Sequence, residues 1–391
     1  MLPDAMPGER QAAILSVNTG SSTLKYAFYP VRDGRVEPAV GSGVLEGLES
    51  GETAFQRALA HLVSHMESPA GALRLVAVAH RVVHGGERFR AATLVDEPVI
   101  EALVGYSPLA PLHQPHNIEG IRRLREHWPD VPQIACFDTA FHAVMPEREY
   151  RFALPESLFR QGIRRYGFHG LSYRHVVDTL DSRRGRPTGR ALLAHLGSGA
   201  SLCAVRDGKS QASTMGFTAL DGLMMGTRSG SLDPGVVLYL LQEGWDPGRI
   251  ERLLYRESGL LGVSGLSPDL RVLRQSREPA AVRAIDLFTA RLVREAGAMT
   301  AVLGGLDLVA FTGGIGEHDA DLRQEMAKRL EFLGVRLEEG RNRAARGDAV
   351  AAIHAPDSAV EVWVVPADEG RAAAREAWAL LASGGRSHPV A

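Results

Sequence analysis

Runs of apolar residues along the chain come in two patterns, one typical of buried strands and one typical of amphipathic helices. The short continuous runs predict strands at residues 12–17, 25–31, 75–83, 134–137, 191–196, 201–206, 306–311 and 360–365. Helical periodicity predicts helices at residues 55–66, 117–128, 234–241, 250–256, 280–303 and 371–381. Asp207-Gly208 is typical of a hairpin turn. Strands and helices that alternate in this way predict an α/β fold.

A glycine turn follows the first strand in each half of the chain. Asn18-Thr19-Gly20-Ser21-Ser22 follows the strand at 12–17, and Gly197-Ser198-Gly199-Ala200-Ser201 follows the strand at 191–196. The two segments share one plan of strand, glycine turn and strand. They indicate two similar domains, each of which presents a glycine turn to a shared cleft.

Length and composition agree with two domains. The chain has 391 residues, and a domain commonly holds about 100–200. Apolar residues make up 45% of the chain, which is enough for packed cores. Lys and Arg number 44 against 46 Asp and Glu, so the net charge gives no indication of nucleic acid or an anionic membrane as a partner.

Nothing in the sequence resembles a targeting or membrane segment. The N-terminus reads MLPDAMPGER and lacks the apolar core of a signal peptide. No run approaches the length of about 18 apolar residues that a transmembrane helix needs. Cys136 and Cys203 lie in apolar stretches and are expected to be reduced, buried thiols. We therefore expect a cytoplasmic protein.

A third glycine-rich turn is expected at Gly313-Gly314-Ile315-Gly316, after the strand at 306–311. Glycines at strand ends let main-chain N–H groups approach phosphate oxygens. Each turn taken alone is more typical of a tight turn without a ligand. Three such turns in one α/β chain favour phosphate binding, although the chain lacks the GxxxxGK[ST] motif of P-loop enzymes.

Arginine and histidine occur in glycine-rich, apolar surroundings at three places. Arg81 lies in His80–Gly86, His169 in Tyr166–Gly170, and Arg228 in Met225–Gly230. A buried arginine is usually paired, so a structural ion pair is one interpretation of each. The other is an anion clamp, because two guanidinium groups match the oxygens of a carboxylate and a phosphoryl group.

Two carboxylates follow predicted strands. Asp138 ends the strand at 134–137, and Glu369 follows the strand at 360–365. Carboxylates at strand ends suit Mg²⁺, which takes one or two of them and keeps water and phosphate ligands. The alternatives are a helix cap or turn residue for Asp138 and an acid of a first helical turn for Glu369.

Specific motifs give the chain a resemblance to the acetate/propionate kinase family. The segments that carry it are SVNTGSSTLKY, AHRVVHGGERF, APLHQPHN, CFDTAFH, YGFHGLSY, HLGSGAS, MGFTALDGLMMGTRSG, FTGGIGEH and VVPADE. The resemblance implies two ribonuclease-H-like domains of the acetate and sugar kinase, chaperone and actin superfamily around an interdomain cleft. The N-terminal domain would hold residues 1–140 plus a C-terminal helix at 370–391. The nucleotide-binding domain would hold residues 141–369. The resemblance also implies a homodimer.

The resemblance assigns catalytic roles to four residues. Arg81 and Arg228 match the paired arginines that hold the carboxylate and the transferring phosphoryl group. His169 matches the histidine that hydrogen-bonds this group in the transition state, and Asp138 matches the acidic active-site residue. They would stabilise direct in-line transfer from ATP to acetate. Because a carboxylate is already deprotonated at pH 7, Asp138 needs no role as a general base.

The same resemblance implies binding sites for a metal ion, ATP or ADP, and the acyl group. Asn18 and Glu369 match the site of Mg²⁺, with Mn²⁺ as the alternative ion. The matching nucleotide positions are Lys25, His195, Leu196, Gly197, Ser198, Gly199, Asp269, Leu270, Arg271, Gly314, Ile315, Gly316, Glu317 and His318. The matching positions of the acetate site are Arg81, Val83, Leu112, His113, Phe168 and Ala219.

The chain departs from the family pattern mainly around the nucleotide and the acyl group. Ser198, His318 and Asp368 each replace an asparagine, which predicts an altered donor or metal preference. The other departures are Ala219 for Pro, Asp221 for Glu, Ser231 for Asp, and Gly170-Leu171-Ser172-Tyr173 for Gly-Thr-Ser-His. Since a proline ring would wall the acetate methyl group, Ala219 predicts that propionate is also a substrate.

Acetate kinase is therefore the function we expect. A propionate or butyrate kinase is the alternative of the same class. A nucleotide-dependent regulator or chaperone of the same fold is the alternative of another class, but it has no use for Arg81, His169 and Arg228 together with an apolar pocket. A sugar kinase would need a base for a hydroxyl group and a polar sugar site, and Val83, Leu112 and Phe168 argue against it.

Overall fold

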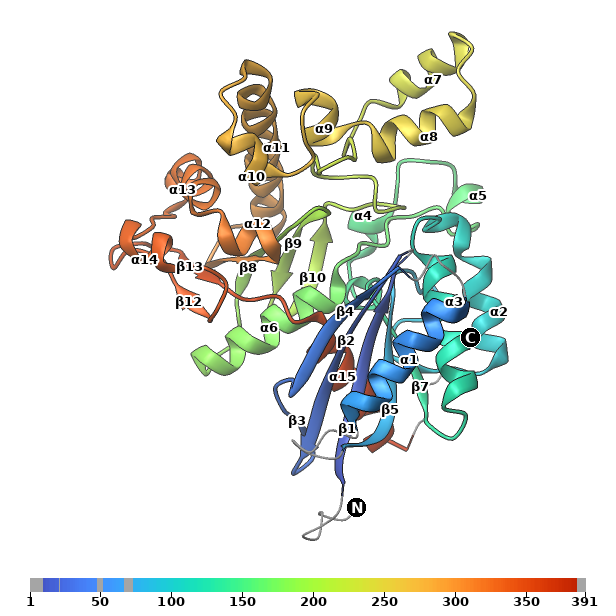
Figure 1. Cartoon of the computed structure of the whole chain (residues 1–391). Coiled ribbons are helices and arrows are strands. Elements are labelled where there is room, and N and C mark those ends of the chain that lie inside the picture. Colours follow the sequence, from blue (N-terminus) through green and yellow to red (C-terminus); the bar gives the residue numbers. More distant parts are fainter. Residues whose placement is uncertain (1–9, 21, 48–51, 67–72, 385–391) are drawn as a thin grey trace. The chain divides into compact units, whose positions relative to one another are not determined.

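A computed structural model describes residues 10–20, 22–47, 52–66 and 73–384 of the chain. The chain forms two compact units, of which the first holds Met1–Phe141 and Asp368–Ala391 and the second holds His142–Ala367. Figure 1 shows the elements of both units. Residues 1–9, Ser21 of the first glycine turn, and residues 385–391 of the predicted C-terminal helix lie outside the described part.

The first unit is built on a mixed sheet whose strands follow the order β3-β2-β1-β5-β7-β6, with β4 paired to β2. Strand β1 is antiparallel to β2 and parallel to β5, and β5 is parallel to β7. The strands are β1 (Gln11–Thr19), β2 (Thr23–Arg32), β3 (Arg35–Val36), β4 (Gly41–Glu46), β5 (Leu73–Val82), β6 (Thr93–Leu94) and β7 (Gln133–Phe137). The helices are α1 (Glu52–Met66), α2 (Glu97–Gly105), α3 (Gln114–His127) and α15 (Glu369–Ala382), and short 3₁₀ helices lie at Ser107–Leu109 and Ala140–His142.

Helices cover both faces of this sheet. Since successive strand residues point to opposite sides, each face has its own set of side chains that pack against these helices. Leu15 of β1 packs in one cluster with Leu59 of α1 and Leu124 of α3. Cys136 of β7 contacts the other side, where its Sγ lies 3.4 Å from the main-chain oxygen of Ala373 in α15. Helix α15 thus completes the core to which strand β1 belongs (Figure 1).

The second unit contains a sheet of the order β10-β9-β8-β11-β13-β12. Its strands are β8 (Arg190–Leu196), β9 (Ala200–Arg206), β10 (Lys209–Ser213), β11 (Leu308–Thr312), β12 (Ala351–Ala352) and β13 (Glu361–Val364). Its helices are α4 (Glu147–Tyr150), α5 (Glu156–Phe159), α6 (Gly170–Arg184), α7 (Pro234–Gln242), α8 (Pro247–Arg256), α9 (Gly259–Ser264), α10 (Leu270–Gln275), α11 (Pro279–Leu303), α12 (Gly313–His318), α13 (Ala320–Arg329), α14 (Glu339–Ala344) and a 3₁₀ turn at Glu331–Leu333.

The two sheets repeat one topology. In each, an antiparallel hairpin leads into three parallel strands, which are β1, β5 and β7 in the first sheet and β8, β11 and β13 in the second. The predicted hairpin turn at Asp207-Gly208 has left-handed φ angles of 49° and 75°, as a two-residue turn of this kind requires. The predicted α/β fold with two similar domains of this superfamily is confirmed.

One expectation about local structure was wrong, and helix α6 was not expected. Gly313–Gly316 is no turn, because helix α12 begins at Gly313 and only this glycine has a left-handed φ, of 77°. Helix α6 was not predicted, because it is buried on several sides and so has no single apolar stripe. Within the described residues, no helix combines the length and apolar character that a membrane span requires.

Candidate active site

Arg81, Asp138 and Glu369 form one charged cluster in the first unit. Arg81 donates to Asp138 through Nε at 3.1 Å and through Nη2 at 2.6 Å. Its Nε also lies 3.3 Å from Glu369 Oε2. Asp138 is 1% exposed, whereas the side chains of Arg81 and Glu369 are 19% and 23% exposed. The two more exposed partners can therefore meet a ligand, and the buried one holds the guanidinium group in place.

Two neighbouring parallel strands of the sheet, β5 and β7, position Arg81 and Asp138. Arg81 lies opposite Cys136 near the ends of β5 and β7, and the main-chain nitrogen of Asp138 donates to the oxygen of Val82 at 3.0 Å. Burial alone would lower the pKa of the Arg81 guanidinium, but the two carboxylates raise it above its ordinary value. Arg81 is thus a permanent cation at the carboxyl ends of the strands.

Helix α15 supplies Glu369 from its first turn, next to a well-bound cap. Asp368 accepts from the main-chain nitrogen of Arg371 at 3.0 Å and from the Tyr29 hydroxyl at 2.6 Å. Burial and the Asp368 carboxylate both raise the pKa of Tyr29, so this hydroxyl stays a donor. The side chain that departs from the family's asparagine therefore caps a helix and ties it to β2.

Asn18 and Lys25 are direct partners across the β1–β2 hairpin. Asn18 is half-buried and Lys25 is exposed. Among the residues that the structure describes, no three His, Cys, Asp or Glu side chains gather as a metal-binding group. Asn18 and Glu369 are hard oxygen donors, and so few protein ligands suit Mg²⁺, which keeps several waters and binds substrate phosphates.

The predicted acyl-site residues of the first unit are linked to one another through α3. Asn117 accepts from the main-chain nitrogen of Val83 at 3.1 Å and donates to the oxygen of Thr19 at 2.8 Å. His113 is the residue before α3, and its oxygen accepts from the nitrogen of Asn117. Leu112 precedes it and is half-buried. One asparagine thus links the strand that carries Arg81 to the Leu112–His113 segment.

In the second unit, His169 and Arg228 converge on Gly199. A Cβ atom placed on Gly199 would lie 3.5 Å from His169 Nε2 and 3.9 Å from Arg228 Nη1. His169 has a left-handed φ of 59° directly before α6, a conformation that is uncommon for a non-glycine residue. Its ring stacks on that of His195 with centroids 4.1 Å apart. The absence of a side chain at Gly199 leaves both of these nitrogen atoms close to the same space.

The loop that carries Arg228 also brings Ala219 to it. Arg228 Nη1 donates to the main-chain oxygen of Ala219 at 2.8 Å, and the nitrogen of Met225 donates to the oxygen of Arg228 at 3.1 Å. Phe168 is 1% exposed, and its main-chain oxygen lies 2.9 Å from His142 Nε2. The predicted acyl-site residues of this unit therefore lie beside the predicted catalytic ones in the sequence or in contact.

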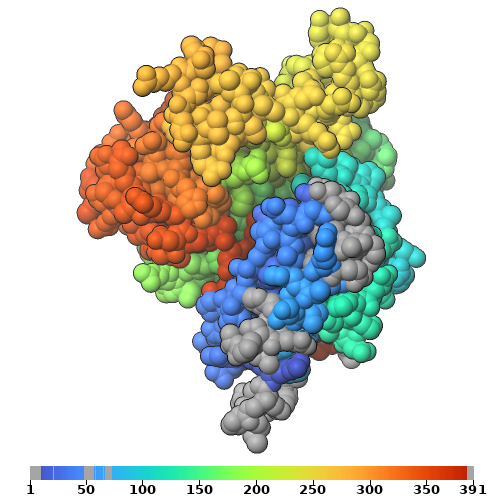
Figure 2. All heavy atoms as spheres, in the orientation of Figure 1, coloured from blue at the N-terminus to red at the C-terminus, as the bar shows by residue number. Residues whose placement is uncertain are grey.

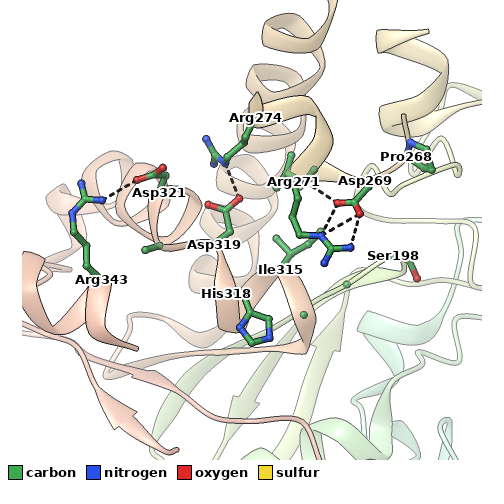
Figure 3. A pocket seen from close by; sticks show the side chains of 14 residues that line it. Ser198, Pro268, Asp269, Arg271, Arg274, Ile315, His318, Asp319, Asp321 and Arg343 are labelled. Carbon is green, nitrogen blue, oxygen red and sulfur yellow. Dashed lines mark hydrogen bonds and ion pairs between the residues drawn. The ribbon is translucent and has the colours of Figure 1, made fainter. Parts of the chain in front are cut away.

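A cavity of about 610 Å³ opens beside the glycine turn of the second unit. Figure 3 shows side chains from the turn, α10, α12, α13 and α14 around it. Among its lining residues are the predicted nucleotide positions Gly197, Ser198, Asp269, Leu270, Arg271, Gly314, Ile315 and His318. Pairs of arginine and aspartate border it, namely Arg271–Asp269 at 2.6 Å, Arg274–Asp319 at 2.7 Å and Arg343–Asp321 at 3.6 Å (Figure 3).

Comparison of the sequence with known proteins identifies the family of the chain. The sequence model of the Acetokinase family matches residues 13–375. The chain belongs to the acetokinase family. It is 47% identical to an acetate kinase of Rhodopseudomonas palustris, with 95% of this chain and 99% of the relative covered. It is 44% identical to an acetate kinase of Methylocella silvestris, with 94% and 98% covered.

Solved structures of this family share the fold of the chain. An acetate kinase of Porphyromonas gingivalis superposes with a TM-score of 0.83 at 35% identity, over 95% of this chain and all (100%) of that one. A propionate kinase of Francisella tularensis superposes with a TM-score of 0.83 at 33% identity, over 93% and 98%. The acetokinase fold therefore occurs in proteins named for either substrate.

Some nucleotide positions predicted from the family pattern are not among the residues that line the cavity. His195 binds Ser172 and stacks on His169. Glu317 is buried, and its Oε1 accepts from the main-chain nitrogen of Ala367 at 2.9 Å. Leu196, Gly199 and Gly316 also do not line the cavity, and Lys25 belongs to the first unit.

Sequence reasoning missed six residues that line the cavity of this acetokinase-family chain. They are Pro268, Arg274, Asp319, Ala320, Asp321 and Arg343. Most flank predicted positions, so the signal was present in Asp319–Asp321, which directly follow His318. Arg343 is different, because only the fold brings α14 to α13.

Proposed function

We propose that the chain is an acetate kinase, which reversibly transfers the γ-phosphoryl group of ATP to acetate and forms acetyl phosphate and ADP. The observation that carries the proposal is the continuity of the glycine turn. Gly197 and Ser198 line the cavity, and at Gly199 the same turn meets His169 Nε2 and Arg228 Nη1. A nucleotide in the cavity has phosphates that suit this pair of donors.

The proposed reaction is an in-line displacement. An acetate oxygen attacks the γ-phosphorus while the bond between this phosphorus and the ADP oxygen breaks. His169 and Arg228 hydrogen-bond the phosphoryl oxygens as negative charge spreads over them. Arg81 binds the anionic substrate, and its contacts with Asp138 and Glu369 use Nε and Nη2. Both oxygens of Asp138 accept from Arg81, which supports a role in positioning.

A magnesium ion is part of the proposal, with Mn²⁺ as its substitute. Asn18 and Glu369 would hold it, since both are partly exposed oxygen donors of the first unit. When bound, the ion would neutralise phosphate charge. The proposed nucleotide ligands are the cavity residues together with the more distant family positions, Lys25 among them.

The acyl specificity has a second candidate. A propionate kinase is favoured by one observation, which is the small side chain of Ala219 next to Arg228. Val83, Leu112 and Phe168 are the proposed apolar neighbours of the acyl group, with His113 beside them. Acetate and propionate differ by one methylene group, and an apolar pocket distinguishes such substrates by only about 1–3 kcal/mol.

We also propose a homodimer in the cytoplasm. Helix α7 presents several large apolar side chains to solvent, which are Val236, Leu238, Tyr239 and Leu241 at 39%, 60%, 57% and 43% exposure. An exposed apolar face of this kind is typical of an interface, and Figure 2 shows the yellow surface of this region. Light scattering coupled to gel filtration tests the dimer.

The cysteines support the proposed cytoplasmic location. Both Cys136 and Cys203 are free and buried, as suits a reducing compartment.

The enzyme is tested by trapping its product. Purified protein with ATP, Mg²⁺ and hydroxylamine is assayed for hydroxamate with acetate, propionate and butyrate. We expect hydroxamate from acetate, and none without ATP. A folded protein that forms no hydroxamate from any of the three acids would exclude the enzyme and leave a nucleotide-dependent regulator of the same fold.

A further inference from the structure

A fully buried arginine, Arg323 of α13, joins two other helices of the second unit. Its Nη1 donates to the main-chain oxygens of Gly316 and Glu317 at 2.8 Å each, both in α12. Its Nη2 donates to the main-chain oxygens of Asn342 at 2.7 Å and Ala345 at 3.0 Å, and its Nε donates to Asn342 Oδ1 at 2.8 Å. A guanidinium group has five N–H bonds, so each of them has an acceptor here.

The acceptors of Arg323 are the carbonyl groups that two helices leave without partners. Gly316 and Glu317 lie in the last turn of α12, and Asn342 and Ala345 lie at the C-terminal end of α14. The last carbonyl groups of a helix have no partner within it, and they carry a partial negative charge that suits a cation. Because arginine only donates, the direction of every one of these bonds is fixed.

Both of these helices contribute residues to the cavity. Helix α12 carries Ile315 and His318 to it, and α14 carries Arg343, the residue after Asn342 (Figure 3). Each helix has six residues, and a helix of this length is not stable by itself in water. Asn342 Nδ2 also donates to the oxygen of Ala320 at 2.8 Å, where α13 begins. The places of α12 and α14 therefore depend on contacts such as those of Arg323.

We propose that Arg323 is a positioning residue for the nucleotide, because it holds α12 and α14 in the arrangement that forms the cavity. The inference rests on the proposed function for the identity of the ligand. Arg323 is not among the residues that line the cavity, so it acts through the two helices. The proposed acyl-site residues do not belong to α12 or α14. Loss of Arg323 should therefore weaken the binding of nucleotide and leave the binding of acetate largely unchanged.

Three variants interrupt this link to different extents, and a fourth is their control. Arg323→Met removes all five bonds, and Arg323→Lys keeps the charge without the planar fork that reaches both helices. Asn342→Ala is milder, since it leaves the guanidinium group its four main-chain acceptors. The control is Arg184→Met. The Arg184 side chain is 6% exposed and donates to Glu361 through Nε and Nη2 at 2.9 Å each, but Glu361 begins β13 at the edge of the sheet opposite the cavity.

Calorimetric titration with ADP and Mg²⁺ and steady-state kinetics test the proposal. If the correct arrangement of the helices is populated only a tenth of the time, the apparent affinity falls about tenfold. We expect Kd for ADP and KM for ATP to rise by about this factor in Arg323→Met and Arg323→Lys, and about threefold in Asn342→Ala. KM for acetate and kcat at saturating ATP should change less than about threefold. Arg184→Met should lose stability to urea but keep Kd for ADP within about twofold of the wild type.

The proposal is overturned if Arg323→Met binds ADP as the wild type does, or if its KM for acetate rises as much as its KM for ATP. It is also overturned if Arg184→Met loses as much affinity for ADP. If the two Arg323 variants do not fold, Asn342→Ala decides, and an unchanged Kd for ADP in this variant overturns the proposal. A wild-type protein that binds ADP but forms no hydroxamate would overturn the proposed reaction alone, and one that does not bind ADP would overturn both.

Discussion

Arg81 and Arg228 donate hydrogen bonds to different kinds of acceptor, although both are proposed to bind anionic groups. Arg81 binds the buried carboxylate of Asp138 through two nitrogens. Arg228 donates to a main-chain oxygen, that of Ala219. The first arginine is therefore also part of an ion pair with a buried carboxylate.

The two arginines can be separated by measuring activity and stability together. Arg81→Ala and Arg228→Ala should each lower kcat about 10²-fold or more, because each removes a positioned donor for developing charge. Arg81→Ala should also lower the free energy of unfolding by about 3 kcal/mol, since the buried carboxylate of Asp138 would lose both hydrogen bonds from the guanidinium group. Arg228→Lys should recover little, because an ammonium group lacks the planar fork. Urea unfolding and the hydroxamate assay measure both effects, and near-wild-type turnover in Arg228→Ala would assign that residue to structure.

Ala219 is the residue on which acyl specificity is expected to depend. If its small side chain leaves room, one more methylene of substrate gains about 0.8 kcal/mol from burial, so kcat/KM for propionate should lie within about tenfold of that for acetate. Ala219→Pro should then reduce kcat/KM for propionate selectively. If the variant changes both substrates equally, Leu220, Met224 or the main chain fills the space instead.

Among the helices, α15 connects stability most directly to the proposed site, because Glu369 lies in its first turn and Asp368 caps it. Two substitutions of this cap residue should affect the free energy of unfolding differently. Asp368→Asn should change the free energy of unfolding by less than about 0.5 kcal/mol, because asparagine caps a helix as well as aspartate does. Asp368→Ala should lower it by about 1 kcal/mol and lose the contact with Tyr29 as well.

The same variants test the expected effect of Asp368 on the metal. Titration of Mg²⁺ and Mn²⁺ in the activity assay gives the apparent metal constants of wild type and Asp368→Asn. Equal constants would assign Asp368 to the helix cap alone. A shift of the constants without a change in stability would instead support the altered metal preference that the sequence predicts.

Elements with a clear apolar period could be predicted from the sequence, but elements buried on several sides could not. Strand β8 and helix α11 were predicted to within a residue or two. Helix α3 begins three residues before the predicted 117, since Pro115 lies in its first turn and resembles a break. The motif around His169 was recognisable, but the contact of its ring with Ser201 of β9 depends on the fold of the second unit, which no local pattern records.

At the scale of the whole molecule, each unit encloses a histidine that is held uncharged. Burial lowers the pKa of both His80 and His142 to about 4, against the weaker opposing effects of their hydrogen bonds to Gln133 and to the main chain of Phe168. The ordinary value is 6.5. Between pH 6.5 and pH 4 the unfolded chain binds these protons and the folded chain does not. Their contribution to stability is thus complete above pH 6.5 and is lost as the pH falls.

Stability should therefore decrease on mild acidification. From pH 7 to pH 5 each histidine should cost the folded state about 2 kcal/mol. Urea unfolding at the two pH values measures the total, and His142→Gln should make the decrease smaller by about that amount. An unchanged decrease in this variant would show that His142 is not the group that titrates.

Because α15 packs on the sheet of the first unit but follows the second unit in the sequence, it affects the order in which the two units can fold during synthesis. A ribosome releases the strands of the first unit early, but the helix that covers their second face and carries Glu369 emerges only after the whole second unit. The second unit is continuous from His142 to Ala367, so its core is complete before that of the first. Domains usually finish folding in the order of their synthesis, and in this protein we expect the reverse. A growing chain would thus acquire the cavity proposed for the nucleotide while the unit that holds Arg81 is still unfinished.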